Sequence, residues 1–513
     1  MIYLKILRRF VPVLSACSLS CFIIACAEQP TVSLFPIKHY DQTIDRWIKP
    51  SDPNFDKPLL NTAMQKKRMD IFYDHYFGLS SPWNAKYIDL IIHRSQVPSL
   101  KATEEDLIKK FSNKNKPNSK IGYGENFRPH TDKWIENIAK NLNIDQFAHL
   151  HYQKNNRGIA VTNLAVRALP TNDVHFYNYQ TAGQGYPFDN LQVSSLWAGT
   201  PIYIVGSTQD HTWYLIISPA LIGWVKSDGI AKTSDTFINT WTITAKNKLA
   251  AITRTQTSLL DGEKRFLLTA YVGSVFPVDV AASQVGVGIK LLIPAADSHH
   301  NAIIKKVLVS KKNAAIMPLT ITPHHFADIM RTLIGRPYGW GGIYFYNDCS
   351  AELKSLFTPF GIWLPRHSSE QLTAGKMVDM SLASPSQRLS YLMTKGKPFL
   401  TITYIGGHVF LYIGNDIVPQ THSLTAMTYQ NLWGLKPNPP VKRVVIGQAV
   451  LFPLLLQYPE NPELTSLVAR KYFKVSYLNE LPVSAKRLIQ EDTVDVRSLM
   501  YPESSDIAEH LFN

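Results

Sequence analysis

The segment GRPYGWGGIYFYNDCSAELKSLFTPFGIWLPRHSSEQ, from Gly335 to Gln371, decides the fold of the C-terminal part of this chain. Asp348 is a good N-cap for a helix, which places Cys349 in the first turn. The apolar residues that follow recur on one helical face and stop before Gly361: Leu353, Leu356, Phe357 and Phe360. The partial positive charge of a helix N-terminus favours a thiolate, and its free N–H groups can stabilise an oxyanion. The segment therefore predicts a nucleophilic cysteine.

A second segment, TYIGGHVFLYIG, supplies the base that a thiol nucleophile needs. From His408 onward, alternate positions belong to the two faces of a β-strand, with Phe410 and Tyr412 on the face of His408. A single histidine is more often a core or surface residue than a catalytic one. Because a strand can pack against the start of the cysteine helix, however, we expect His408 to be the base.

A third group is needed to orient the imidazole. The sequence GNDIVPQTHSL follows, and Gly414, Asn415 and Asp416 predict a turn with a return strand. A hairpin with an odd-length loop would place Gln420 and His422 on the face of His408. We favour His422 as the third catalytic residue, since imidazole is a common orienting group, and Gln420 stays open as the alternative.

Outward from this part, the 513 residues divide into several domains, so the predicted fold class is α+β and multidomain. Helical spacing dominates 26–155, short β-runs of SH3-like character fill 156–240, and 241–317 is a second, weaker SH3-like candidate. The catalytic domain is predicted at 318–455. Residues 456–513 form an extension that is expected to wrap back on the folded part.

The first 25 residues predict a signal peptide, with a positive region (Lys5, Arg8 and Arg9) before an apolar stretch that ends at Ala25. The sequence from Ile23 to Cys26 resembles a bacterial lipobox, which implies lipidation of Cys26. A retained membrane anchor and plain secretion are the alternatives. The lipobox interpretation predicts a protein of the cell envelope, anchored by lipid on the periplasmic side of the inner or outer membrane.

Cysteine content and charge agree with an exported protein. The four cysteines are Cys17, Cys21, Cys26 and Cys349, so a chain processed at Cys26 keeps one free thiol and no structural disulfide. The net charge of +14 favours anionic lipid, lipopolysaccharide or wall polymer, whereas export argues against nucleic acid. The densest basic run extends from Lys109 to Lys120. We interpret it first as a solvated loop and second as a contact with a polymer.

The motifs RPYGWGG, NDCS, GIWLPRHSSEQ and GGHVFLYIG together resemble the NlpC/P60 superfamily of papain-like cysteine peptidases. The stretch from Leu196 to Ile230 is similar to a bacterial SH3-like domain. The resemblance implies hydrolysis of amide bonds in peptidoglycan stem peptides or muropeptides, often between γ-D-glutamate and the diamino acid, with a free N-terminal L-alanine required. DCSA in place of the commoner DCSG, and a slightly short spacing before the cysteine, leave the subsites open.

The same resemblance implies residue roles: Asp348 and Ser350 contact the peptide, and Tyr338 and Trp340 line the pocket. Arg366 either supports the site or forms a structural salt bridge. In the implied mechanism the Cys349 thiolate attacks the carbonyl, and no metal or cofactor is expected. Two other functions remain open: a peptidoglycan-binding protein without activity, and an acyltransferase or amidase on another substrate.

Overall fold

A computed structural model describes residues 32–93, 99–178, 183–280, 288–419, 422–438, 443–482 and 499–500. The signal segment, Cys26 and Gln420 lie outside these residues, so the expectations about them are carried forward as such. Among the residues that are described, no helix has the length and apolar character needed to cross a membrane.

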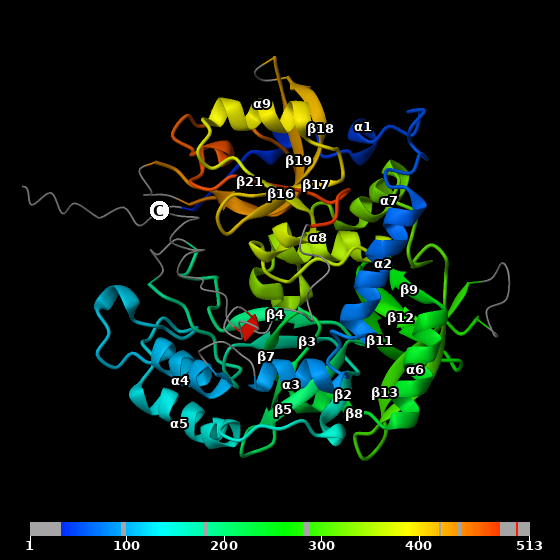
Figure 1. The fold of residues 1–513 in the computed structure, drawn as a ribbon. Helices are drawn as coiled ribbons and strands as arrows, with labels where there is room; N and C mark the ends of the chain where they lie inside the picture. The colour runs from blue at the N-terminus through cyan, green and yellow to red at the C-terminus, as the bar shows by residue number, and fades with distance from the viewer. Residues whose placement is uncertain are drawn as a thin grey trace, which may run out of the picture.

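The N-terminal part is helical, as predicted. Side chains of Asn61, Ser99 and Thr131 cap three of its helices by accepting backbone N–H groups from the first turn. The helices are α1 (Ile44–Trp47), α2 (Thr62–Phe77), α3 (Ala85–His93), α4 (Leu100–Phe111) and α5 (Asp132–Leu142). The apolar faces of α3, α4 and α5 pack against the β-domain that follows, and α2 runs from that region up to the C-terminal sheet (Figure 1).

The first β-domain is a seven-stranded sheet in the order β4-β3-β7-β6-β5-β2-β8. Its strands are β2 (Arg157–Ala160), β3 (Leu164–Arg167), β4 (Gln192–Leu196), β5 (Pro201–Ser207), β6 (Trp213–Ile217), β7 (Ile222–Lys226) and β8 (Ile230–Lys232). One face encloses a small apolar core, and the opposite side, which includes the buried Trp224, packs on α3–α5. The predicted SH3-like series of strands is present here, including the hairpin between β5 and β6.

A second β-domain follows, built on α6 (Asp235–Asn247). Its strands are β9 (Leu249–Ile252), β10 (Thr257–Leu260), β11 (Phe266–Ala270), β12 (Val275–Pro277), β13 (Ile289–Ala296), β14 (Ala302–Val309) and β15 (Ala314–Ile316). They form three small sheets around a core that also receives Phe72 and Tyr76 of α2. Because α2 packs on this domain, the N-terminal helices bind it to the rest of the molecule.

The C-terminal part is a seven-stranded sheet in the order β1-β20-β19-β18-β17-β21-β16, covered by helices on both faces. Its strands are β1 (Val32–Leu34), β16 (Lys376–Asp379), β17 (Thr401–Tyr404), β18 (Val409–Val418), β19 (Ser423–Leu435), β20 (Arg443–Pro453) and β21 (Lys474–Tyr477). The helices are α7 (Pro323–Leu333), α8 (Cys349–Phe357) and α9 (Pro385–Lys395), and η7 (Trp340–Phe345) is a short irregular helix before α8. The odd-numbered residues Val409, Leu411 and Ile413 pack with α7 and α8, and the even-numbered ones pack on the side of α9.

Two expectations about this sheet need correction. The predicted turn at Gly414–Asp416 lies inside β18, because a β-bulge between Tyr412 and Gly414 absorbs the glycine and the strand continues to Val418. The other correction concerns the predicted domain boundary: Lys474–Tyr477 of the extension wrap back, as expected, but they form β21, which lies between β17 and β16 and pairs with both. The sheet of the catalytic domain therefore extends beyond the predicted end of that domain at residue 455.

Candidate active site

Cys349 is the first residue of α8 and is 6% exposed. The Asp348 carboxylate caps the helix by accepting the Ala351 N–H at 2.9 Å, as the sequence predicted. The sulfur accepts hydrogen bonds from the backbone N–H groups of Val409 and Ser350. Since Val409 directly follows His408, the start of β18 meets the start of α8. The structure therefore brings the predicted nucleophile and the predicted base to the same point.

Hydrogen bonding fixes the proton on the His408 ring. The Gln430 amide nitrogen donates to the Thr428 hydroxyl at 2.8 Å, and that hydroxyl donates to the Phe452 carbonyl at 2.7 Å. The Gln430 oxygen therefore faces His408 and accepts from its Nε2–H at 2.7 Å. Because Nε2 carries the proton, Nδ1 keeps a lone pair that can take the proton of the thiol.

The orienting residue is thus Gln430, and the expectation for His422 is wrong. His422 lies exposed in the tight turn between β18 and β19, with its N–H on the Val418 carbonyl. His408 lies at the other end of β18, about 30 Å away along a strand of this length. The predicted turn lies earlier in the sequence than the observed one. The residues predicted to lie opposite His408 are therefore also earlier in the sequence than Gln430, which contacts it.

Burial decides the resting charges of the pair. It raises the pKa of the Cys349 thiol to about 12, and the neighbouring Asp348 carboxylate acts in the same direction. Burial also lowers the pKa of His408 to about 4, against the opposing effect of its hydrogen bond to Gln430. The resting pair is a neutral thiol and a neutral imidazole, rather than the thiolate that a helix N-terminus alone favours.

Arg366 joins the nucleophile's helix to the first β-domain. Its guanidinium contacts both carboxylate oxygens of Asp348, at 2.6 and 3.2 Å, and donates to the Ser350 hydroxyl at 2.8 Å. From the other side, its Nε donates to the Ser194 hydroxyl at 2.6 Å, and Nη2 donates to the Val193 carbonyl at 3.3 Å. Arg366 therefore fits both interpretations. It forms a buried salt bridge with Asp348, and this salt bridge also supports the site.

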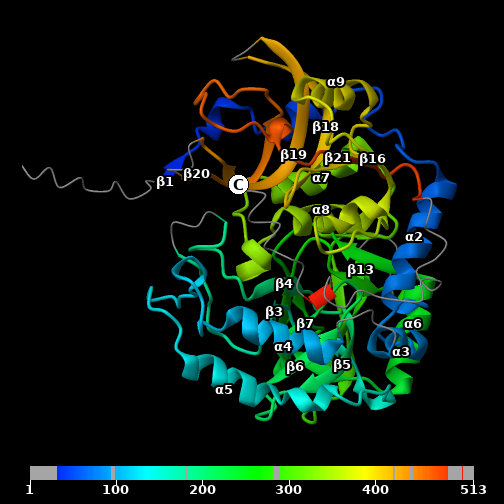
Figure 2. The ribbon, with the colours of Figure 1, turned by 60° about the vertical axis from the view of Figure 1, so that its left-hand side comes forward.

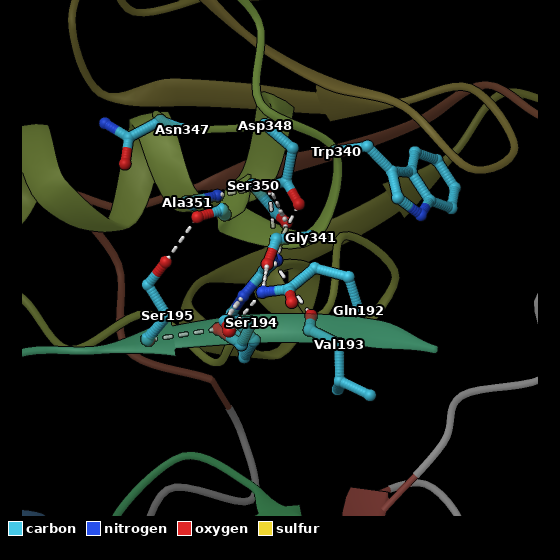
Figure 3. Close-up of polar contacts among 12 residues, drawn as sticks. Gln192, Val193, Ser194, Ser195, Trp340, Gly341, Asn347, Asp348, Ser350 and Ala351 are labelled. Carbon is cyan, nitrogen blue, oxygen red and sulfur yellow. Dashed lines mark hydrogen bonds and ion pairs between the residues drawn. The ribbon is translucent and has the colours of Figure 1, made fainter. Parts of the chain in front are cut away.

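Strand β4 of the first β-domain forms one wall of the cleft. Figure 3 shows Gln192–Ser195 lying beneath Gly341 and the first turn of α8. The Gln192 amide donates to the Gly341 carbonyl at 2.9 Å, and the Ser195 hydroxyl donates to the Gly342 carbonyl at 2.6 Å. A Cβ on Gly341 or Gly342 would lie 2.3 or 2.2 Å from β4, and both have positive φ. These glycines therefore bring η7 against the wall, in addition to any approach to substrate.

Aromatic rings pack around Trp340 and Tyr338, which line the cleft. The Trp340 indole donates to the Asp189 carbonyl at 3.1 Å and meets Phe188 edge-on at 5.0 Å. Trp433 contacts Phe188 at 4.8 Å and Tyr338 at 6.0 Å. The Tyr338 oxygen accepts the Cys349 backbone N–H, so its hydroxyl lies at the start of α8.

A single pocket contains the predicted Cys349, its predicted neighbours and residues that the sequence did not indicate, whereas His408 and His422 are not among its lining residues. It is lined by Asn190, Gln192, Val193, Tyr338, Trp340, Gly341, Asp348, Cys349, Ser350, Arg366, His367, Ser368 and Gly407. The predicted peptide contacts, Asp348 and Ser350, are present, although Arg366 already occupies their oxygens. The β4 residues carried no signal in the sequence, since nothing local links them to a cysteine more than a hundred residues later.

Comparison with known proteins follows this geometry. Family models match an NlpC/P60 stabilising domain at residues 12–147, an SH3 domain of SH3b1 type at 175–226, an SH3 domain of SH3b2 type at 234–281 and the NlpC/P60 family at 335–434. The expected α+β architecture of SH3-like modules before an NlpC/P60 domain is confirmed.

Two relatives illustrate the match. A gamma-D-glutamyl-L-lysine dipeptidyl-peptidase of Bacillus subtilis is 34% identical over 91 residues, or 17% of this chain. The match spans only 29% of that curated relative's length. A solved NlpC/P60 endopeptidase from Photobacterium damselae subsp. piscicida is 28% identical, with 88% of this chain and 100% of that chain covered at a TM-score of 0.74.

Proposed function

We propose that this chain, a cysteine peptidase with an NlpC/P60 domain behind two SH3 domains, hydrolyses γ-D-glutamyl–diamino acid bonds in peptidoglycan stem peptides. The observation that carries the proposal is the meeting of α8 and β18: the Cys349 sulfur accepts the N–H of Val409, the residue after His408, and Gln430 holds the proton of His408 on Nε2. A binding protein without activity would have no use for such an arrangement. The activity in the name of the Bacillus subtilis relative also supports this bond.

The geometry supports a two-step hydrolysis. As the Cys349 sulfur attacks the scissile carbonyl carbon, Nδ1 of His408 takes the thiol proton and the imidazolium then gives it to the leaving amine. The C–N bond breaks and a thioester remains. Water attacks that thioester, its proton passes through Nδ1 back to sulfur, and a carboxylic acid leaves. The Tyr338 hydroxyl, which lies at the Cys349 N–H, is the group proposed to stabilise the oxyanion.

The wall formed by β4 favours short substrates with a free N-terminus. Because β4 is held against η7 and α8 by Gln192, Ser195 and Arg366, the first β-domain limits the cleft on that side. A peptide that ends inside the cleft fits this arrangement, whereas a stem still joined to glycan requires room past the wall. We therefore propose free stem peptides or small muropeptides as substrates.

The location belongs to the same proposal. The lipobox-like sequence ending at Cys26 and the net charge of +14 support an envelope lipoprotein, attached by lipid on the periplasmic side. Incorporation of labelled palmitate into the wild-type protein, and its loss in Cys26→Ala, is the expected result. Labelling that persists in Cys26→Ala would contradict the assignment of this residue.

A digest of purified muropeptides by the chain lacking residues 1–26, read by mass spectrometry, tests the activity. The wild type is expected to cut between γ-D-glutamate and the diamino acid, and Cys349→Ala serves as the inactive reference. Blocking the N-terminal L-alanine with an acetyl group is expected to prevent cleavage. Peptidoglycan binding with no cleavage by either chain would instead favour the non-catalytic binding protein, and cleavage of blocked stems would contradict the role of the wall.

The resting charges predict the pH dependence. A base with a pKa of about 4 is available above that value, so kcat/KM is expected to stay level down to about pH 5 and to fall through about pH 4. Because the pKa of the thiol is raised, alkylation of Cys349 by iodoacetamide should rise about tenfold per pH unit between about pH 6 and 9. An alkylation rate that is flat across this range would show a preformed thiolate and contradict the neutral pair.

A further inference from the structure

Four large apolar side chains lie exposed on one side of the molecule. Val32 and Leu34 of β1 are 62% and 79% exposed, and Phe127 and Tyr186 are 62% and 50% exposed. Val32 pairs with Arg443 of β20, whose guanidinium donates to the Tyr186 carbonyl. The Tyr186 ring in turn lies 6.0 Å from that of Phe127. Figure 2 shows β1, β20 and the loop between α4 and α5 on this same side.

The loop that carries Phe127 is strongly basic. From Lys109 in the last turn of α4 to residue 130, the segment has one acidic residue, Glu125, and six basic ones: Lys109, Lys110, Lys114, Lys116, Lys120 and Arg128. The Asn113 side chain bonds to the backbone of Gly122 and His130, so the two halves of the loop are held together. Lys114, Lys120 and Arg128 are exposed. We call the four apolar residues and these three cations the anchor-side face.

The position of the proposed anchor selects the partner of this face. If Cys26 is acylated, as proposed above, only residues 27–31 separate the lipid from Val32. An extended chain of that length reaches about 20 Å, so β1 is held close to the lipid headgroups. A cell-wall polymer would be bound by the cations alone. Exposed aromatic and aliphatic side chains among cations match the headgroup region of a bilayer.

We propose that the anchor-side face is a membrane-docking surface for anionic lipid. Its lysines and Arg128 neutralise the headgroups, and Phe127, Tyr186, Val32 and Leu34 enter the boundary with the acyl chains. Tyr186 is two residues before Phe188, which packs against Trp340 of the cleft. Docking therefore holds the cleft close to the lipid surface, because only this one loop separates the two. At that position small released fragments are within reach and the intact wall is farther away.

Vesicle flotation of the unacylated chain beginning at Ala27 tests this face without the lipid anchor. All described elements begin at or after Val32, so this chain retains them. It is expected to float with vesicles of phosphatidylglycerol and phosphatidylethanolamine, to bind phosphatidylcholine vesicles at least about tenfold more weakly, and to be released by salt. Lys114→Glu/Lys120→Glu/Arg128→Glu and Phe127→Ser/Tyr186→Ser are each expected to lower affinity at least about tenfold.

Matched controls come from the second β-domain. Lys264→Glu/Lys311→Glu/Lys312→Glu makes the same change in net charge at exposed lysines, and Phe266→Ser removes an aromatic side chain that is 61% exposed. Both controls are expected to bind like the wild type. An equal loss in the two charge-reversal variants, or binding to anionic polymer but not to vesicles, would overturn the proposal.

Palmitate labelling tests the lipid anchor separately. Labelling of Cys26 without any vesicle binding by the unacylated chain would support the anchor and overturn the docking face. Vesicle binding without labelling would support the face and overturn the anchor.

Discussion

Replacing His408 with alanine is expected to lower kcat/KM by about 10³–10⁴-fold, because it removes the imidazole proposed to take the thiol proton. Replacing Gln430 with alanine should lower kcat/KM about 10–100-fold. The imidazole would then keep its position on the strand but lose the acceptor that holds the proton on Nε2. Kinetics on a purified stem peptide, with circular dichroism to verify folding, measures both effects.

His422→Ala is the matched control for this pair of variants, since it removes an imidazole from the exposed turn of the same hairpin. It should leave kcat/KM unchanged within about twofold. Gln430→Glu distinguishes orientation from packing: a carboxylate at this position favours the imidazolium and moves the acid limb of the pH profile upward. A large loss in His422→Ala, or an acid limb that Gln430→Glu leaves in place, would contradict the assigned network.

Replacing Arg366 with methionine is expected to lower the free energy of unfolding by about 3–5 kcal/mol, because it leaves the Asp348 carboxylate buried without its partner. Activity should fall about 100-fold or more, since Asp348 and Ser350 flank the nucleophile. Urea unfolding and kcat/KM on the same samples measure the two effects. Lysine cannot replace Arg366, because its ammonium group cannot contact two carboxylate oxygens and Ser194 at once as the planar guanidinium does.

The double variant Asp348→Asn/Arg366→Met separates stability from activity. Removing both charges avoids the unpaired carboxylate, so much of the lost stability is expected to return. Activity is not expected to return, because the contact from α8 to Ser194 and Val193 of β4 remains broken. Recovery of activity together with stability would show that Arg366 acts on the fold alone.

Local patterns were sufficient for the helix and the strand that carry the predicted nucleophile and the predicted base. The N-cap at Asp348 and the apolar spacing after Cys349 define α8 within ten residues, and the alternation after His408 defines β18. Both patterns depend on contacts between near neighbours in the chain, which is why they could be read from the sequence. The Gly-Trp-Val strand of the first β-domain, β7, was predictable for the same reason.

The rest of the site depends on register and on distant contacts. Gln430 reaches His408 only because a bulge carries β18 through Gly414 and delays the turn, and sequence turn signals at Gly414–Asp416 pointed elsewhere. The wall from β4 arises from packing between residues about 150 positions apart, such as Gln192 and Gly341. No periodicity within one segment encodes such a contact.

The place of β21 in the C-terminal sheet sets the order in which the enzyme can mature. The nucleophile is synthesised more than a hundred residues before β21, which lies between β17 and β16. Until β21 has emerged, β17 has an open edge and the sheet that carries the base is incomplete. A growing chain therefore holds its cysteine without a finished catalytic domain. The sheet is complete only when β21 has taken its place between β17 and β16.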